Sequence, residues 1–103
     1  MIQTSESVGA AVAAQQPVVA LESTVISHGL PFPHNLNLAR SMEGEVREHG
    51  AQPATIGVVG GVPTVGMSDA QIEHFAQASG VLKLSRRDIA YAVAMARDGA
   101  TTV

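Results

Sequence analysis

The sequence predicts an α/β fold in which helices cover both faces of a largely parallel sheet. Short apolar runs rich in Val and Ile alternate along the chain with segments of helical periodicity, which is the pattern of strands joined by crossover helices. Gly and Pro residues separate many of these segments, as expected for turns and loops. Aromatic residues make up only 3% of the chain and hydrophobic residues 46%, so we expect a core of mainly aliphatic side chains.

Candidate capping residues mark where the predicted helices begin. Ser5, Ser68 and Ser85 each precede a helical segment, where a hydroxyl can accept from a free backbone N–H; Gln71 completes a capping box with Ser68. Asn35 is expected to cap a further helix. The predicted elements are, in order, an N-terminal helix before Pro17, a buried strand over 18–26, a loop over 27–35, a helix over 36–49 that ends at Gly50, strands over 53–61 and 62–67 joined by a tight turn, a helix over 69–78, an extended segment over 80–85, a helix over 86–99 and a strand from residue 100.

The length of 103 residues allows a single small domain. We expect residues 1–16 to form an N-terminal helix or tail and residues 17–103 to belong to one domain. Three helices around four short strands give limited cover for a parallel sheet, which needs cover on both faces, and the last predicted strand has only begun at Val103. We therefore expect the chain to be the N-terminal part of a larger domain, either as a fragment or as a truncated gene product.

Charge and composition argue against several classes of protein. The formal net charge is −3 at pH 7, whereas general nucleic-acid binding needs a basic surface. No apolar run approaches the length of a membrane span, and the N-terminus lacks the basic region and cleavage pattern of a secretory signal. Cysteine is absent, which fits a reducing compartment. We expect a cytoplasmic protein that has neither a nucleic-acid nor a membrane partner.

Glu22 stands inside an apolar run, at a position where a purely structural strand would carry valine. In open α/β sheets, ligands bind beyond the carboxyl ends of the strands. An apolar environment disfavours the charged form of a carboxyl group, so such a group can act as a proton donor near neutral pH. Alternatively, Glu22 is the first exposed position of the strand or the partner of an arginine. The residue pattern does not decide between these alternatives.

Lys83 is the only lysine of the chain and is flanked by Leu82 and Leu84. A desolvated lysine is suited to chemistry because its charge state is easily altered. In the alternative arrangement, which composition alone favours, the apolar stem packs on the protein and the ammonium group reaches water.

Arg86 and Arg87 precede the last predicted helix, where free backbone N–H groups favour an anion, so they are candidates to hold a phosphate. An ion pair with Asp88 on the surface explains them equally well. The four histidines show no metal-ligand spacing, so we expect no zinc site made from them. The glycines at 57, 60 and 61 fit a tight hairpin better than a phosphate-binding loop.

Four segments occur in order between Pro17 and Val103, and their sequences are ALESTVISHGLPFPHNL, EVREHGAQPATIGVVGG, VGMSDAQIEHFAQ and KLSRRDIAYAVAMARDGATTV. The most specific features are LEST-x-I-x-HG before a Pro-rich loop, and K-x-S-RRD before G-x-TTV. Together, these segments resemble the N-terminal part of the pseudouridine-5'-phosphate glycosidase family.

The resemblance implies a three-layer α/β/α fold with a mixed, largely parallel sheet. It implies the reversible cleavage of the C–C glycosidic bond of pseudouridine 5'-phosphate to uracil and ribose 5-phosphate, a step of pseudouridine degradation. It also implies Mn²⁺ as cofactor, these small molecules as partners and a homotrimer when the protein is full length.

Matched residue by residue, Glu22 corresponds to the family's proton donor, Lys83 to a substrate-binding lysine and Val103 to a substrate-contacting position after the paired threonines. Four further residues are candidates for contacts to the phosphate or for loop contacts: His28, Arg86, Arg87 and Thr102. The family's nucleophilic lysine and metal-binding aspartate lie beyond the matched segment. The resemblance therefore places no metal ligand here, and we expect the 103-residue chain alone to be inactive.

The chemistry of the family agrees with an acid at this position. Uracil attached through carbon leaves less readily than uracil attached through nitrogen, and in the family an imine between the opened sugar and a lysine supplies the electron sink. Protonation by a carboxylic acid assists the opening of the ring, which suits Glu22. A rival hypothesis is a non-catalytic sugar-phosphate-binding module that uses Lys83 and the Arg86–Arg87 helix start. A third is an oligomerisation segment without a ligand.

Overall fold

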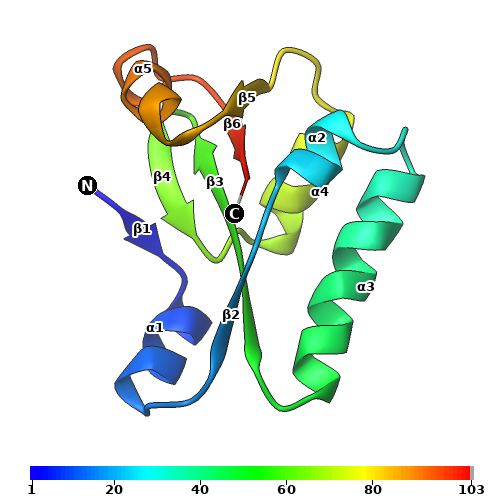
Figure 1. Cartoon of the computed structure of the whole chain (residues 1–103), viewed down its shortest axis with the longest axis vertical. Helices are drawn as coiled ribbons and strands as arrows, with labels where there is room; N and C mark the ends of the chain where they lie inside the picture. Colours follow the sequence, from blue (N-terminus) through cyan, green and yellow to red (C-terminus); the bar gives the residue numbers. More distant parts are fainter. Residues whose placement is uncertain (103) are drawn as a thin grey trace.

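The sheet of this protein contains six strands and is flanked by helices in the computed structural model, which describes residues 1–102 (Figure 1). The strands are β1 (Gln3–Thr4), β2 (Val18–Leu21), β3 (Gln52–Val59), β4 (Val62–Val65), β5 (Leu82–Leu84) and β6 (Gly99–Thr101). The helices are α1 (Glu6–Ala13), α2 (Thr24–His28), α3 (His34–Glu48), α4 (Asp69–Gln77) and α5 (Ile89–Ala94), and a 3-10 turn over Arg86–Asp88 precedes α5. None of the helices within residues 1–102 has the length and apolarity needed to cross a membrane.

The sheet is mixed, with the strand order β1-β4-β3-β6-β5 and with β2 also paired to β3. The pairs β1–β4, β2–β3 and β5–β6 are parallel, whereas β3–β4 and β3–β6 are antiparallel. β4 follows β3 directly through the predicted turn, in which Gly60 and Gly61 both have positive φ angles, as a tight hairpin requires. β1 was not predicted, because two residues ahead of a helix carry no recognisable strand pattern.

Helices cover both faces of the sheet, because successive side chains of β3 point to opposite sides. Val58 packs in a cluster with Leu84 and with α5. Gly57 faces the other side, where an added Cβ would lie 2.8 Å from Met67 Sδ and 3.3 Å from Phe75 Cε2 of α4. The predicted α/β fold with cover on both faces is therefore confirmed. The larger core cluster consists of Ile26, Leu36, Ala39, Met67, Ile72, Phe75, Ala76, Val81 and Ala100.

The predicted strand over 18–26 is wrong in length and in burial. β2 ends at Leu21, and α2 begins at Thr24, because Ser23 O accepts from Ile26 N (3.0 Å) and turns the chain into a helix. Val19 in the middle of β2 is 40% exposed. The apolar run thus serves a short, partly exposed strand and then a helix whose Ile26 enters the core, an arrangement that strand propensity alone does not reveal.

Asn35 lies inside the first turn of α3 and does not cap it, which corrects the sequence prediction. Its buried side chain donates to Ile26 O (2.7 Å) and Ala76 O (2.8 Å), and its Oδ1 accepts from Leu36 N (2.8 Å). Ile26 lies in the last turn of α2, and Ala76 lies in the last turn of α4. Asn35 therefore joins α2, α3 and α4, and the loop predicted over 27–35 shrinks to the residues between α2 and α3.

The remaining helix boundaries follow the sequence more closely. Ser5 Oγ accepts from Val8 N (3.2 Å) at the start of α1, and Ser68 forms the predicted capping box. α3 is followed by Gly50 with a φ of +82°, as expected for a helix stop. The last helix is shorter than predicted: α5 ends at Ala94, and Gly99 belongs to β6.

Candidate functional site

Two strands end facing each other along β3 (Figure 1). β2 runs parallel to β3 and reaches Leu21 opposite Thr55, whereas β6 runs antiparallel to β3 and pairs Ala100 with Gly57. The carboxyl ends of β2 and β6 consequently point toward each other at Ile56. Because ligands bind beyond the carboxyl ends of strands in α/β sheets, this meeting point is the natural place for a site.

Ser23 and Thr101 join the two strand ends, and we call these two residues together with Ile56 the strand junction. Ser23 N donates to Thr101 O (3.0 Å), and Thr101 N donates to Ser23 Oγ (2.9 Å). Both hydroxyls donate to Ile56 O; the distance is 2.6 Å for Ser23 Oγ and 2.7 Å for Thr101 Oγ1. Ser23 is fully buried and Thr101 nearly so, so these bonds are shielded from competing water.

Glu22 and Thr102 are the chain neighbours of the strand junction. Glu22 is half-buried between Leu21 and Ser23, and Thr102 is exposed directly after β6. No ion pair joins Glu22 to another side chain among the described residues, so an arginine partner within residues 1–102 does not explain it. The structure thus brings the predicted proton donor and a predicted phosphate contact to the same point from opposite directions.

Lys83 enters the same region from the neighbouring strand. β5 is parallel to β6 and pairs Lys83 with Ala100 and Leu84 with Thr101, so both strands end at the same level. Paired residues share a face of the sheet, and Ala100 belongs to the core cluster that contains Ile26 of α2. Lys83 is exposed and lies on the face that α2 covers, and His28, also exposed, ends that helix.

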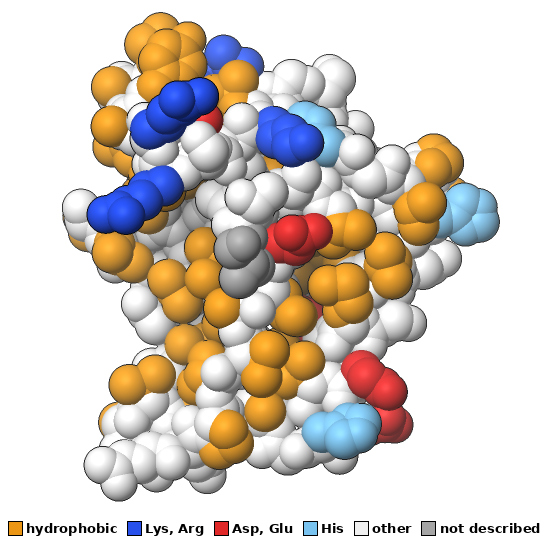
Figure 2. Space-filling view, in the orientation of Figure 1, with side chains coloured by type: hydrophobic (Ala, Val, Ile, Leu, Met, Phe, Trp, Pro, Cys, Tyr) orange, Lys and Arg blue, Asp and Glu red, His pale blue; other side chains and the backbone are white. Residues whose placement is uncertain are grey.

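In the segment after β5, Asp88 accepts hydrogen bonds from Ser85 and forms no ion pair with another of residues 1–102. Asp88 accepts from Ser85 N (2.9 Å) and from Ser85 Oγ (2.7 Å), and these bonds, first of all the one from the backbone, hold the pKa of Asp88 below its usual range. Arg86 and Arg87 are exposed and form no ion pair with residues 1–102. The proposed Arg–Asp pair is therefore replaced by a cap, and Figure 2 shows cationic side chains gathered around β5 and α5.

Two expectations concern groups that lie outside this arrangement. Val103, the predicted substrate contact, lies outside the described residues. Within residues 1–102, no three His, Asp or Glu side chains lie close enough to hold a metal ion. The described residues thus do not fit a manganese site.

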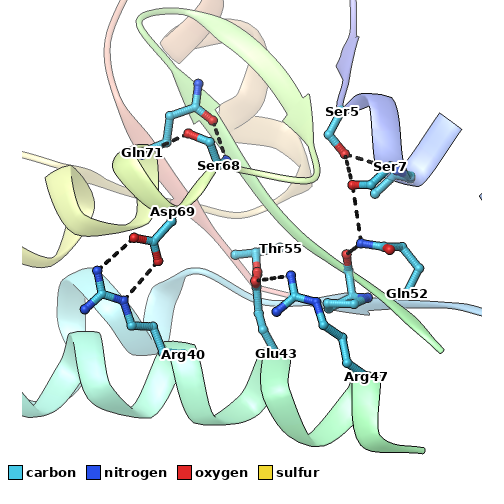
Figure 3. A network of polar contacts seen from close by, with 12 residues as sticks. Ser5, Ser7, Arg40, Glu43, Arg47, Gln52, Thr55, Ser68, Asp69 and Gln71 are labelled. Atoms are coloured by element: carbon cyan, nitrogen blue, oxygen red, sulfur yellow. Dashed lines mark hydrogen bonds and ion pairs between the residues drawn. The ribbon is translucent and has the colours of Figure 1, made fainter. Parts of the chain in front are cut away.

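A large cavity lies elsewhere, between the start of α1, the start of α4 and the side of α3; we call it the α3–α4 cavity. It has a volume of about 660 Å³ and none of the predicted site residues lines it. Its two arginines are already paired: Arg40 binds Asp69 (2.8 Å), and Arg47 binds Glu43 (3.2 Å) (Figure 3). Thr55 beneath it donates to Glu43 Oε2 (2.6 Å).

The sequence prediction missed Ser23 and Thr101, which join the ends of β2 and β6. Ser23 directly follows Glu22, and Thr101 directly precedes Thr102, each within two positions of apolar residues. A hydroxyl buried in a strand needs a hydrogen-bond partner, and this was the signal available in the sequence. Thr24, which follows Ser23 in the sequence, has a buried hydroxyl without a hydrogen-bond partner among the described residues.

Comparison with known proteins agrees with this description. A curated protein of Roseiflexus sp. named Pseudouridine-5'-phosphate glycosidase is 64% identical over 99% of this chain and 34% of its own length. One of the same name from Herpetosiphon aurantiacus is 67% identical over 93% of this chain and 32% of its own length. These relatives confirm the resemblance seen in the sequence, and the chain spans about a third of their length.

Solved structures share the fold over the whole chain. The prealnumycin C-glycosynthase AlnA, crystallised with ribulose 5-phosphate, superposes with a TM-score of 0.86 at 43% identity, covering 100% of this chain and 33% of its own. An indigoidine synthase A-like protein of Thermotoga maritima gives a TM-score of 0.84 at 35% identity, with the same coverage. The model of the family described as "Indigoidine synthase A like protein" matches residues 7–103. The chain therefore belongs to the indigoidine synthase A-like family.

Proposed function

We propose that this chain contributes to the active site of a pseudouridine-5'-phosphate glycosidase, which reversibly cleaves the C–C glycosidic bond of its substrate to give uracil and ribose 5-phosphate. The observation that carries the proposal is the convergence of the carboxyl ends of β2, β5 and β6, which brings together Glu22, Lys83 and Thr102. The names of the most similar curated relatives support the same reaction.

In this proposal, Glu22 donates a proton to the ring oxygen of the ribose as the ring opens. Its half-buried position beside a closed strand junction is suited to an acid that must keep one orientation. Lys83, Thr102 and Val103 contact the sugar phosphate, and the exposed Arg86 and Arg87 add positive charge nearby. AlnA was crystallised with a pentose phosphate, which supports a ligand of this class.

The nucleophilic lysine and the ligands of Mn²⁺ are proposed to come from the part of the protein that corresponds to the remaining two thirds of the relatives. Within residues 1–102, no group of three His, Asp or Glu side chains could hold the metal. Lys83 is a binding residue in this proposal and not the nucleophile. Assembly as a homotrimer in the cytoplasm is part of the same proposal.

The test uses a chimera in which this chain replaces the matching third of the Roseiflexus sp. relative, and it measures the release of uracil from pseudouridine 5'-phosphate. Glu22→Gln is expected to lower kcat by about 100-fold or more, since a positioned general acid contributes on this scale, with binding of ribose 5-phosphate retained. Glu48→Gln, an exposed glutamate on α3, is the matched control and should keep full activity. Lys83→Ala is expected to raise KM.

The outcomes separate the alternatives. A chimera that turns over and depends on Glu22 supports the proposal, whereas a Glu22→Gln variant as active as Glu48→Gln overturns the role of Glu22. A chimera that binds ribose 5-phosphate through Lys83 without any turnover favours the sugar-phosphate-binding module. The 103-residue chain alone is expected to release no uracil, and release by that chain would contradict the division of the site proposed here.

A further inference from the structure

The strand junction joins two strands that have no other direct connection. β2 and β6 each pair with β3 but not with each other, because they meet end to end instead of running side by side. The ladders with β3 fix each end on that strand, but no ladder joins the two ends to each other. The bonds of Ser23 and Thr101 are therefore the direct link between the strand ends that carry Glu22 and Thr102.

The Ser23 hydroxyl is the central atom of the junction, since it accepts from Thr101 N and donates to Ile56 O. An alanine at this position can make neither bond and would leave a buried backbone N–H without a partner, which is costly. Gly57 leaves the space that this hydroxyl occupies, because a Cβ at Gly57 would lie 3.3 Å from Ser23 Oγ. The site is thus built around the serine oxygen.

The Thr101 hydroxyl donates a second hydrogen bond to Ile56 O, the β3 carbonyl that the Ser23 hydroxyl also binds. Ile56 O accepts from Ser23 and from Thr101, over 2.6 Å and 2.7 Å, so both strand ends are tied to one oxygen. A carbonyl has two lone pairs and can accept both bonds. The two strand ends consequently share one reference point, and displacement of one end is transmitted to the other.

We propose that Ser23 and Thr101 are positioning residues that hold the proton donor Glu22 in register with the phosphate-binding end of β6. The inference rests on the proposed function, because it assigns a role to groups that act through Glu22. A small displacement of an acid from its reacting atom costs a large factor in rate. Loss of either hydroxyl should therefore lower kcat while the fold persists.

The experiment compares variants of the chimera described above. Thr101→Val keeps the shape and removes the hydroxyl, and it is expected to lower kcat by about tenfold or more. Thr101→Ser restores the hydroxyl and should recover most of the activity. Thr64→Val is the matched control: Thr64 is equally buried and its hydroxyl donates to Val62 O (2.9 Å), but on β4. Its kcat should stay within about twofold of the unmodified chimera.

A double-mutant cycle distinguishes positioning from a general loss of structure. If Thr101 acts through Glu22, Thr101→Val should reduce the residual rate of the Glu22→Gln variant by less than about twofold. An equal loss in both backgrounds, or an equal loss from Thr64→Val, overturns the inference. Ser23→Ala, in the same cycle, gives a second reading if Thr101→Val does not fold. Failure of the proposed function is recognised separately, because Glu22→Gln alone would then keep its activity.

Discussion

The strand junction and the α3–α4 cavity are both polar, yet they are held by different interactions. At the strand junction, the side chains are buried hydroxyls, with Ser23 at 0% and Thr101 at 8% exposure, and each polar atom has a short bond. Around the cavity, the charged side chains are largely exposed, with Arg40 at 45% and Asp69 at 65%. Buried hydrogen bonds fix position, whereas exposed ion pairs contribute little.

The α3–α4 cavity and the predicted site residues do not coincide. The cavity has a volume of about 660 Å³, but its arginines already bind carboxylates, and the predicted site residues lie elsewhere. The exposed cations of β5 and of the segment after it, Lys83, Arg86 and Arg87, form no ion pair among the described residues. Among residues 1–102, the lysine and arginine side chains without a carboxylate partner thus lie in and after β5 and not around the α3–α4 cavity.

The largest effect on stability is expected at Asn35. Its polar side chain is buried, like those of the strand junction, although it lies away from the junction. Asn35→Ala leaves the carbonyls of Ile26 and Ala76 without their donor, and two unpaired buried groups should cost about 2–4 kcal/mol. Chemical denaturation of the 103-residue chain measures this loss. Asn37→Ala, an exposed asparagine on the same helix, is the control and should cost less than about 0.5 kcal/mol. Equal losses would contradict the distinction between buried and exposed polar groups.

An intermediate effect is expected at Thr55, a buried residue whose hydroxyl donates to Glu43 at the α3–α4 cavity. Thr55→Val removes the bond to Glu43 Oε2 (2.6 Å) from a side chain that is 2% exposed. Hydrogen bonds to charged groups are stronger than neutral ones, so we expect a loss of about 1–2 kcal/mol in the free energy of unfolding. Thr4→Val on β1, where the threonine is exposed, is the control. A loss no larger than that of the control would mean that burial does not set the strength of polar contacts around the cavity.

Sequence reasoning succeeded where the interactions are local. The caps at Ser5 and Ser68 and the hairpin at Gly60–Gly61 depend on residues within a few positions of one another, and all are confirmed. Asn35 was misassigned because its partners lie on two other helices. A capping residue and a buried connecting residue look alike in one sequence.

The site shows the same division. Glu22 and Lys83 were singled out as candidates because a carboxylate and an ammonium group are conspicuous in apolar runs. The strand junction was not predicted, because Ser23 and Thr101 are 78 positions apart and only the opposite directions of β2 and β6 along β3 bring them together. Strand direction in a mixed sheet is decided by long-range packing, which strand patterns do not contain.

The smallest effect is expected at the ion pair of the α3–α4 cavity, where pH provides the sharpest measurement. Arg40 Nε and Nη2 donate to Asp69 over 2.9 Å and 2.8 Å, and these bonds hold the pKa of Asp69 below its ordinary value of 3.8. A carboxyl group whose pKa is lower in the folded chain stabilises the fold above the unfolded pKa and loses this contribution as the pH falls through the folded value. Asp69→Asn should therefore lower the Tm slightly near neutral pH and progressively less below about pH 4.

Thermal unfolding of the chain and of Asp69→Asn at a series of pH values measures this difference. Because both side chains are exposed, added salt should reduce the difference, whereas the losses at Asn35 and Thr55 should be insensitive to salt. Glu48→Gln, with no ion pair among residues 1–102, is the control for removing an exposed carboxylate. A Tm difference for Asp69→Asn that matches Asn35→Ala in size, or that persists unchanged at high salt and low pH, would show that this exposed ion pair contributes as much as the buried hydrogen bonds of Asn35.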